Sequence, residues 1–495
     1  MVINDRMEQC YHCEACVQAC PVHAIHMEDD GRGFRKPQID ETVCINCGLC
    51  ARVCPLNVQM AAYKHGVEQQ HIRGIKRLDE KKRRESQSGG AFSVIAEYVL
   101  AQHGVVYGAA LDDDLNCRYQ RVDKAEELVK LKGSKYVQAE VLEVYQSIRE
   151  DLKKGSKVLF GGTACAVLGL RTFLGEEPEG LITCDLVCHG VASPDVYRHY
   201  RDYQEKRHGE KLTDFNFRDK KFGWHSHVET FTLESGKEEA DVLYRNLYYG
   251  HLCMRESCYH CPFADMSRVS DITIGDFWGI EKTHAEWDDN LGISLFITNT
   301  PKGEAVFQAV SGELEFIVSN SEECLQPHLA YPVQKPEGVE LFWEEYRNKN
   351  FYYILKKYGS DNQKFLGDVA VTQNLETKKK KGINIANYFT ERDCSRIALC
   401  GLNENTEMLV AELEAGGISV ECILETVCDN AECRKYACGK PVIPIAGLKA
   451  KEAQEIDRYV VMCEQFFLDI VQELRRIEVP LYKVAPISFL AAMEV

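Results

Sequence analysis

The sequence predicts a chain of mixed α+β and α/β class in three parts: a small metal-binding module, a mixed α/β core and a small βαβ domain. Three observations predict this. Two runs of four closely spaced cysteines lie within residues 10–54. Across residues 88–359, strand-like segments first alternate with amphipathic helices and then follow one another with fewer helices between them. From residue 396 a strand, helix, strand order begins again.

The cysteine runs are two copies of one pattern. C-x2-C-x2-C-x3-C-P occurs at residues 10–21 and again at 44–55. Three close thiolates can grip three corners of one cubane, and the fourth, held away by its proline, reaches the other cluster. The pattern resembles that of bacterial ferredoxins. We expect two 4Fe-4S clusters, one on Cys10, Cys13, Cys16 and Cys54 and the other on Cys44, Cys47, Cys50 and Cys20. A zinc ribbon or disulfides would be the alternative, but zinc ligands usually come as two separated pairs.

Length and composition favour an intracellular globular protein. The 495 residues suffice for about three domains. No signal peptide precedes Cys10, and no apolar run is long enough for a membrane span. The 23 cysteines are therefore expected to be metal ligands or buried thiols in a reducing, anaerobic cytoplasm.

Charge excludes one class of partner. The formal net charge is −17, which argues against nucleic acid. Residues 71–85 nevertheless carry seven Lys and Arg against three Asp and Glu. We interpret this stretch as a solvated linker helix, with a docking patch for an acidic electron carrier as the sharper alternative.

These features predict the domain boundaries, with a hairpin at residues 29–39 inside the first domain. We expect a two-cluster ferredoxin domain at 1–62, a basic linker at 63–87, a cofactor-binding core at 88–359, a linker at 360–395 and a degenerate Rossmann-like domain at 396–495.

The core shows the periodicity of both element types. Helices are expected at 91–103, 139–154 and 163–174, and a further helix starts at Ser193-Pro194. Strands are expected at 105–111, 157–160, 181–188, 214–218, 227–233, 271–275 and 293–298.

Four core cysteines are candidates for a third metal site. Cys258 and Cys261 form a C-x2-C pair, and Cys165 and Cys188 follow predicted strands. The carboxyl ends of strands are where open α/β sheets bind ligands. On position alone, a third cluster and ordinary buried thiols are equally good interpretations of Cys165 and Cys188. The remaining candidates, which could replace a ligand, are Cys184, Cys253 and Cys324.

Glycine-rich turns suggest a phosphate-bearing cofactor. Ser88-Gly89-Gly90 and Gly161-Gly162-Thr163 each precede a predicted helix, whose N-terminus can bind an anion. Ser134, Lys135 and Tyr136 add a cation and an aromatic ring. Proton supply or anion binding near this cofactor is expected from His189, Lys220 and His225. For Lys220 an ordinary salt-bridged strand end is an equally good interpretation.

Several motifs together resemble one family. GTACAVLGLR (162–171), DLVCHGVASP (185–194), FRDKKFGW (217–224), ESCYHCPFA (256–264) and SDITIGDFWGI (270–280) resemble the beta subunits of deazaflavin-coenzyme-reducing hydrogenases and dehydrogenases. The resemblance covers residues 1–350. It implies bound FAD and a core 4Fe-4S cluster on Cys165, Cys188, Cys258 and Cys261. It places flavin contacts on Ser88, Gly89, Gly90, Ser134, Lys135, Tyr136, Gly162 and Thr163.

One departure concerns the substrate. The family commonly has Thr-Pro-Cys-Gln where this chain has Thr-Ala-Cys-Ala at residues 163–166. The missing glutamine removes an amide that could bond flavin or substrate. The tail resembles nucleotide-binding domains of sugar-modifying proteins, but residues 401–405 lack the G-x-G-x-x-G glycines, so we expect no dinucleotide there.

The sequence therefore predicts an iron–sulfur flavoprotein oxidoreductase. Electrons would pass between the ferredoxin-type clusters and FAD, and on to a small organic substrate or the deazaflavin coenzyme. The alternatives are a non-catalytic electron-transfer subunit and a reductase of surface-polysaccharide biosynthesis. Expected partners are a ferredoxin or another redox protein, a small-molecule substrate and, as one compatible assembly, a second copy of the chain.

Overall fold

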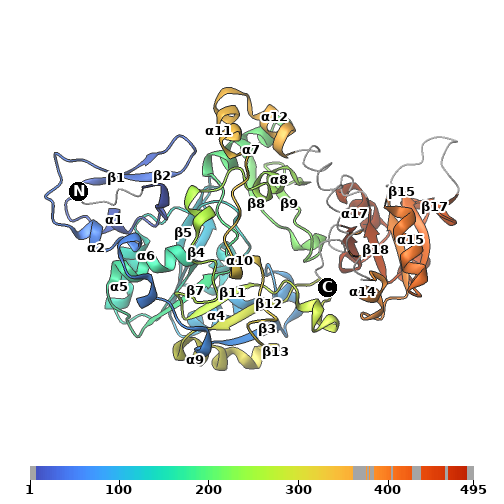
Figure 1. The fold of residues 1–495 in the computed structure, drawn as a ribbon, viewed down its shortest axis with the longest axis horizontal. Helices are drawn as coiled ribbons and strands as arrows, with labels where there is room; N and C mark the ends of the chain where they lie inside the picture. Colours follow the sequence, from blue (N-terminus) through green and yellow to red (C-terminus); the bar gives the residue numbers. More distant parts are fainter. Residues whose placement is uncertain are drawn as a thin grey trace.

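The computed structural model describes residues 7–359, 375, 378, 384–402, 405–425, 436–462 and 467–487. Figure 1 shows the cysteine-rich module at one end of the molecule, the large core in the middle and the tail domain at the other end. The predicted mixture of α/β and α+β architecture is confirmed. The domain boundaries themselves stay predictions.

One eight-stranded sheet forms the base of the core. Its strand order is β13-β3-β12-β11-β7-β6-β4-β5. The strands are β3 (His71–Arg77), β4 (Val105–Leu111), β5 (Cys117–Val122), β6 (Val158–Thr163), β7 (Leu181–Leu186), β11 (Ile272–Asp276), β12 (Ser294–Thr298) and β13 (Leu314–Ser319). The four central strands β4, β6, β7 and β11 are parallel, and the pairs outside them are antiparallel.

Helices cover both faces of this sheet, because the central strands are apolar on both sides. Helices α4 (Ala91–Ala101) and α9 (Pro301–Val310) share one core with β4, β6 and β11. Helices α5 (Val144–Lys153) and α6 (Ala164–Leu174) share another with β6. The carboxyl ends of β6 and β7 thus lie between the two helical layers. The turns that carry Cys165 and Cys188 follow these strand ends.

The cysteine-rich module packs on α6. It contains α1 (Ala15–Gln18), α2 (Leu49–Arg52) and the predicted hairpin, formed by β1 (Ile25–Asp29) and β2 (Arg35–Ile39). Gly169 of α6 permits close approach, because a Cβ there would lie 2.7 Å from Cβ of Cys13. A residue with no side chain therefore fixes how near the module comes to the core.

The predicted basic linker at 63–87 is wrong for its central part. Residues His71–Arg77 form β3, which is hydrogen-bonded to β13 on one side and to β12 on the other. In the sequence, this strand alternates small or apolar residues with cations, but its high charge led to the linker interpretation. Tertiary pairing, rather than composition, determines the structure of this segment.

Much of the positive charge of this segment is unavailable to an acidic carrier. Four of its seven cations are buried, and ion pairs join Arg73 to Glu304, Arg77 to Glu97 and Glu313, and Arg83 to Asp289. Lys81 and Arg84 are exposed, and Lys82 is half-buried. Arg77 is 3% exposed. These pairs tie β3 and the following helix α3 (Glu80–Arg84) to the rest of the core.

A second, aromatic layer lies over the sheet edge. It consists of the three-stranded sheet β8 (Leu212–Asn216), β9 (Glu229–Leu233) and β10 (Glu238–Asp241), with α7 (Pro194–His208), α8 (Leu243–Tyr249), α11 (Val339–Asn348) and α12 (Phe351–Ile354). Helix α7 begins as predicted, since Ser193 Oγ accepts from the backbone N–H groups of Asp195 and Val196. Among its core residues are Tyr197, Tyr244 and Trp343.

The tail is a Rossmann-like sheet of order β16-β17-β15-β14-β18-β19. Its strands β14 (Arg396–Cys400), β15 (Ser419–Glu425), β17 (Lys440–Pro444), β18 (Arg458–Val461) and β19 (Val484–Pro486) run parallel, and β16 (Tyr436–Ala437) is antiparallel. Helix α14 (Ala386–Thr390), inside the predicted second linker, packs in this domain's core. Residues 403–404 of the glycine-poor turn lie outside the described residues.

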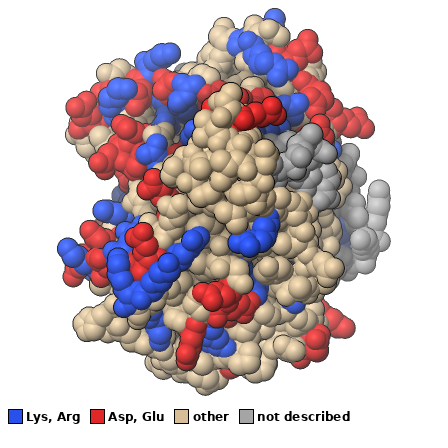
Figure 2. Space-filling model, turned by 90° about the vertical axis from the view of Figure 1, so that its left-hand side faces the viewer, with Lys and Arg blue, Asp and Glu red and all other residues tan. Residues whose placement is uncertain are grey.

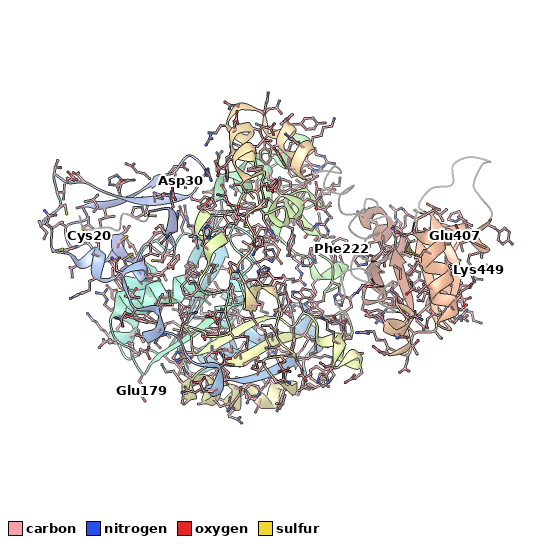
Figure 3. The ribbon with its side chains drawn as sticks, in the orientation of Figure 1. Cys20, Asp30, Glu179, Phe222, Glu407 and Lys449 are labelled. Atoms are coloured by element: carbon pink, nitrogen blue, oxygen red, sulfur yellow. The ribbon has the colours of Figure 1, made fainter. Side chains whose placement is uncertain are left out.

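The tail contacts the core through both apolar and polar side chains. Phe222 and Val228 pack into the tail's core, and Figure 3 shows Phe222 between the two domains. Asn290 Nδ2 donates to Val484 O at 3.2 Å. In the described parts of the chain, every helix is too short or too polar to cross a lipid bilayer.

Candidate redox site

The eight cysteines of the module line two separate cavities. Cys10, Cys13, Cys16 and Cys54 surround one, which we call the proximal site. Cys20, Cys44, Cys47 and Cys50 surround the other, the distal site. The fourth cysteine of each run has thus crossed to the other set, the grouping expected from the spacing. Apolar side chains such as Pro55 and Ile25 fill the remaining walls.

The four core cysteines are also brought together. Cys165 at the start of α6, Cys188 after β7, and Cys258 and Cys261 around the short helix η7 (Glu256–His260) line one cavity, the core site. The alternative candidates are elsewhere: Cys184 and Cys253 are buried in apolar clusters, as is Cys324. Sequence position could not separate these sets, whereas folding does.

Four thiols facing one small cavity fit an iron–sulfur cluster. Burial raises the pKa of Cys188, Cys258 and Cys261, the last to about 12. Such thiols stay protonated at neutral pH unless a bound cation compensates for their charge. The donor set is therefore suited to a thiolate-bound cluster.

A cavity of about 310 Å³ lies next to the core site and shares Thr163, Cys165, Cys188 and Arg255 with it. It also shares Tyr11, His12 and Cys13 with the proximal site. We call it the central cavity. Its volume is that of a small-molecule or cofactor pocket. The proximal and core sites thus both adjoin the central cavity, whereas the distal site shares no lining residue with it.

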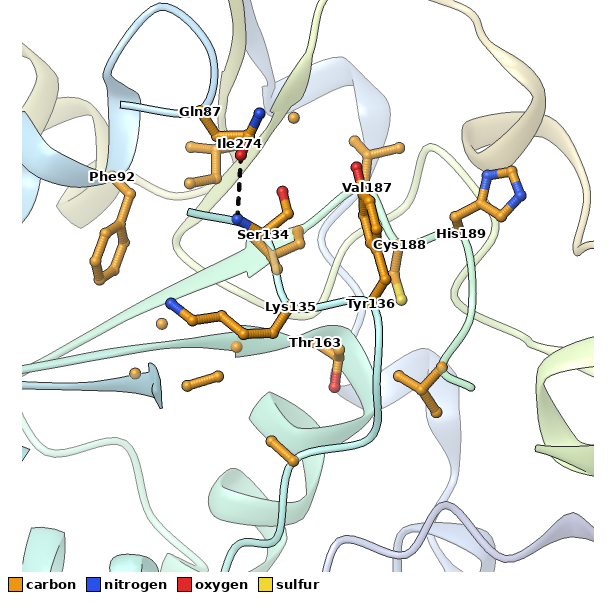
Figure 4. Close-up of a pocket in the computed structure, with 18 of the residues that line it drawn as sticks. Gln87, Phe92, Ser134, Lys135, Tyr136, Thr163, Val187, Cys188, His189 and Ile274 are labelled. Atoms are coloured by element: carbon orange, nitrogen blue, oxygen red, sulfur yellow. Dashed lines mark hydrogen bonds between the residues drawn. The ribbon is translucent and has the colours of Figure 1, made fainter. Parts of the chain in front are cut away.

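The predicted glycine-rich turns converge on the central cavity. Ser88, Gly90, Ser134, Lys135, Tyr136, Gly162 and Thr163 all line it. Gly89 does not: a Cβ there would lie 2.1 Å from Ile75 O, so this glycine packs against β3. Figure 4 shows Ser134 and Thr163 among the lining residues and marks the hydrogen bond that Ser134 N donates to Gln87 Oε1 at 3.4 Å.

Lys135 is a cation at this wall. Its Nζ donates to the carbonyls of Lys132 at 2.6 Å and Gly133 at 3.1 Å. Burial lowers the pKa of Lys135 to about 8, against raising contributions from Cys117 and Asp214. The helices α4 and α6 also present their N-termini here, since Gly90, Ala91, Thr163 and Ala166 line the cavity. This wall can bind an anionic group such as a diphosphate.

Of the three predicted catalytic residues, only His189 lines the central cavity. Its Nε2 lies 2.6 Å from Nε2 of His251, and its ring centroid lies 3.9 Å from that of His328. Burial, together with these two imidazoles, lowers the pKa of His189 to about 2. His189 is therefore a neutral side chain in this structure.

The predictions for Lys220 and His225 are corrected by their contacts. Lys220 Nζ donates to the carbonyls of Arg83 at 2.6 Å, Ser86 at 2.9 Å and Ser88 at 2.6 Å, so it holds the serine–glycine turn from behind. His225 Nε2 lies 2.9 Å from Asp288 Oδ2, away from the cavity lining. Charge and residue type alone could not show which way these side chains face.

Another part of the central cavity's lining is aromatic and cationic, and neither Arg218 nor His227 nor Tyr249 was predicted from the sequence as a site residue. Arg218 Nη1 donates to Asp276 Oδ2 at 2.6 Å and lies over the ring of Trp278. His227 and Tyr249 line the same end, with ring centroids 5.1 Å apart. In the sequence, Arg218 and Trp278 belong to the motifs FRDKKFGW and GDFWG, which are rich in cations and aromatic residues. Lys220, instead of Arg218, was the residue predicted from the first motif.

Comparison with known families agrees with this geometry. Residues 76–146 match the family described as coenzyme F420 hydrogenase/dehydrogenase, beta subunit N-terminus, and residues 155–322 match its C-terminus. The chain thus contains both domains of this beta-subunit family. Residues 9–58 match the 4Fe-4S dicluster domain, so the family core carries a two-cluster ferredoxin module at its amino end.

Curated relatives match the module alone. Hydrogenase-4 component A of Escherichia coli K12 is 46% identical over 55 residues, which are 11% of this chain and 24% of that protein. Ferredoxin 7Fe of Hydrogenibacillus schlegelii is 44% identical over 43 residues, 9% of this chain and 49% of that one. The chain spans a quarter or less of the length of the first curated relatives it matches.

One solved structure also matches part of the chain. It is a chain of the F420-reducing [NiFe] hydrogenase complex of Methanosarcina barkeri, 16% identical, with a TM-score of 0.36. The match covers 61% of this chain and 91% of that chain.

Proposed function

We propose that this protein is a flavin-dependent oxidoreductase in which electrons pass between a redox partner and a small organic substrate. The path runs through the distal, proximal and core sites to FAD in the central cavity. The observation that carries this proposal is the placement of the cysteines. Three sets of four cysteines line three cavities, and the core site shares its walls with a cofactor-sized cavity. FAD, when bound, supplies the conversion between one-electron and two-electron transfer.

The residues of the central cavity suit FAD at both ends. Lys135 and the N-termini of α4 and α6 provide positive charge for the diphosphate. Tyr136, stacked on Tyr248 at 4.6 Å, provides a flat apolar wall. Arg218 and His227 also line the cavity, where a substrate would lie. They replace Lys220 and His225 as candidates for anion binding.

The distal site is the entry point for the redox partner. Cys47 is exposed, and the apolar side chains of Val43 and Ile45 beside it are 45% and 60% exposed. Figure 2 views this end of the molecule and shows acidic and basic side chains intermingled around an uncharged area. We expect a small redox protein such as a ferredoxin to dock there over the distal cluster, on a surface in which neither charge sign dominates.

The deciding experiment measures iron, acid-labile sulfide and flavin per chain after purification without oxygen. About twelve iron atoms, the content of three cubanes, and one FAD are expected. The C188S variant should retain about eight iron atoms, because it removes one ligand of the core site. The matched control C184A removes a buried thiol that lines no cysteine cavity, and should retain all twelve.

Two results would contradict the proposal. Wild-type protein with about eight iron atoms and no flavin would leave clusters in the ferredoxin module only. Iron content that is equal in wild type and C188S would exclude the core site as a cluster site. Flavin bound without reduction of any small organic substrate would instead favour an electron-transfer subunit that serves a partner enzyme.

A further inference from the structure

Arg255 is a buried cation between the proximal and core sites. It is 7% exposed and lies three residues before Cys258. Its backbone N–H donates to Val191 O at 3.0 Å, and Met254 pairs with Ala192, so the segment is held against the turn that follows Cys188. The backbone therefore fixes where the guanidinium can reach.

The guanidinium contacts a cysteine of the core site and the backbone beside the cysteines of the proximal site. Its Nη2 lies 3.5 Å from Cys165 Sγ at the core site. Its Nη1 donates to Tyr11 O at 2.5 Å, and its Nε to Ser257 Oγ at 2.9 Å. Ser257 Oγ in turn donates to Cys10 O at 2.9 Å. One side chain thus spans the space between the two sites.

This cation has no carboxylate partner among the described residues, whereas two other buried arginines of the core do. Arg218 pairs with Asp276 and Arg268 with Asp185. An uncompensated buried charge is strongly unfavourable. The acidic groups around it are thiols of the cysteine sites, and Cys165 Sγ lies 3.5 Å from its Nη2. Its compensating charge must therefore come from the cysteine sites.

We propose that Arg255 is a positioning residue that balances the charge of the proximal and core clusters together and raises the reduction potential of both. This rests on the proposed function, since it requires a cluster at the core site. A cluster with four thiolates is anionic and becomes more negative by one charge on reduction. A cation at the sulfur atoms stabilises that reduced state most.

The position between the sites matters for transfer. In each step one electron leaves the proximal cluster, which is oxidised, and enters the core cluster, which is reduced; no bond or proton changes place. Two neighbouring anionic clusters repel an added electron. Arg255 offsets this repulsion at both clusters, so it keeps the reduction potentials of the proximal and core clusters close.

The test is a potentiometric titration, followed by electron paramagnetic resonance, of the full-length protein prepared without oxygen. In R255Q the core and proximal midpoint potentials should fall, while the distal midpoint and the iron content stay at the wild-type values. R255K retains the charge and should shift less than R255Q. The control K335Q removes a cation that pairs with Glu256 and Glu340 near the surface, and should shift none of the three.

Each result of this titration either supports or contradicts the proposed role of Arg255. A core midpoint in R255Q equal to that of wild type, with iron unchanged, overturns the proposal. If R255Q loses the core cluster, a core cluster retained in R255K supports the charge-balancing role, and loss in both variants assigns Arg255 to packing and overturns it. Absence of a third cluster from the wild-type protein is visible before any variant is made, and it refutes the proposed function instead.

Discussion

Lys135 is the residue whose charge depends most on what fills the central cavity. Its amine is held by backbone carbonyls and lies near Cys117 and Asp214, with no carboxylate within ion-pair distance among the described residues. Burial therefore lowers its pKa to about 8. A bound diphosphate would favour the charged form and raise that pKa.

We predict a pH-dependent flavin affinity from this shift. Below pH 8 the free protein already carries the charge, so affinity should be constant. Above pH 8 the neutral amine of Lys135 must take up a proton on binding, so affinity should fall by up to about tenfold per pH unit until the pKa of the complex is reached. Fluorescence titration with FAD between pH 6.5 and 9.5 measures it.

Two variants make this prediction specific. K135M should bind FAD more weakly at pH 7 and lose the decline above pH 8. K130M, which changes an exposed lysine on the preceding short helix Ala125–Leu131, should behave like the wild type. An undiminished decline in K135M would show that another group titrates.

At the scale of elements, the serine–glycine turn before α4 depends on Lys220. Three carbonyls of residues 83–88 accept hydrogen bonds from its amine. The turn carries Ser88 and Gly90 at the wall of the central cavity. The position of this wall is therefore set by a residue of the segment between β8 and β9, far away in sequence.

We predict that K220M loosens the turn. Loss of the amine leaves buried carbonyls without their donor, which should lower the free energy of unfolding by about 2–3 kcal/mol and weaken FAD binding. Denaturant unfolding and FAD titration measure the two effects. The adjacent K221M, which breaks pairs with Asp219 and Glu238, is the control and should change stability by less than about 1 kcal/mol. Equal effects of both substitutions would contradict the prediction.

Sequence periodicity predicted the local elements well where packing agreed with it. The helix at 163–174 and the strands at 181–188 and 271–275 are found as α6, β7 and β11 with ends shifted by a few residues. It failed at β3, because three Lys and Arg within seven residues outweighed the signal of a strand. Those cations are compatible with a central position only through carboxylates such as Glu304, which comes more than two hundred residues later.

At the scale of the whole molecule, the contact between the ferredoxin module and α6 sets the spacing of the cluster sites. Gly169 and Cys13 meet at this contact. Gln18 strengthens it, since its Oε1 accepts from Tyr145 N at 2.9 Å. The module is thus a packed part of the core face rather than a tethered domain.

We predict that G169A separates the proximal site from the core. The added methyl group would overlap Cys13, so the module must move, at a cost of about 1–3 kcal/mol in unfolding free energy. The magnetic interaction between the reduced proximal and core clusters should weaken in the electron paramagnetic resonance spectrum. G312A, where a Cβ meets nothing within 4 Å, is the control. A G169A spectrum and stability equal to those of wild type would refute this account.

The sequence by itself determined the chemistry: which cysteines occur at cluster spacing, that the core is mixed α/β, and which glycine turns precede helices. These are local properties, fixed by spacing along the chain. Only the tertiary structure decided which side chains share a cavity. It separated Cys188 from Cys184, turned Lys220 and His225 away from the central cavity and placed Arg218, His227 and Arg255 at it, because these choices depend on packing between segments far apart in sequence.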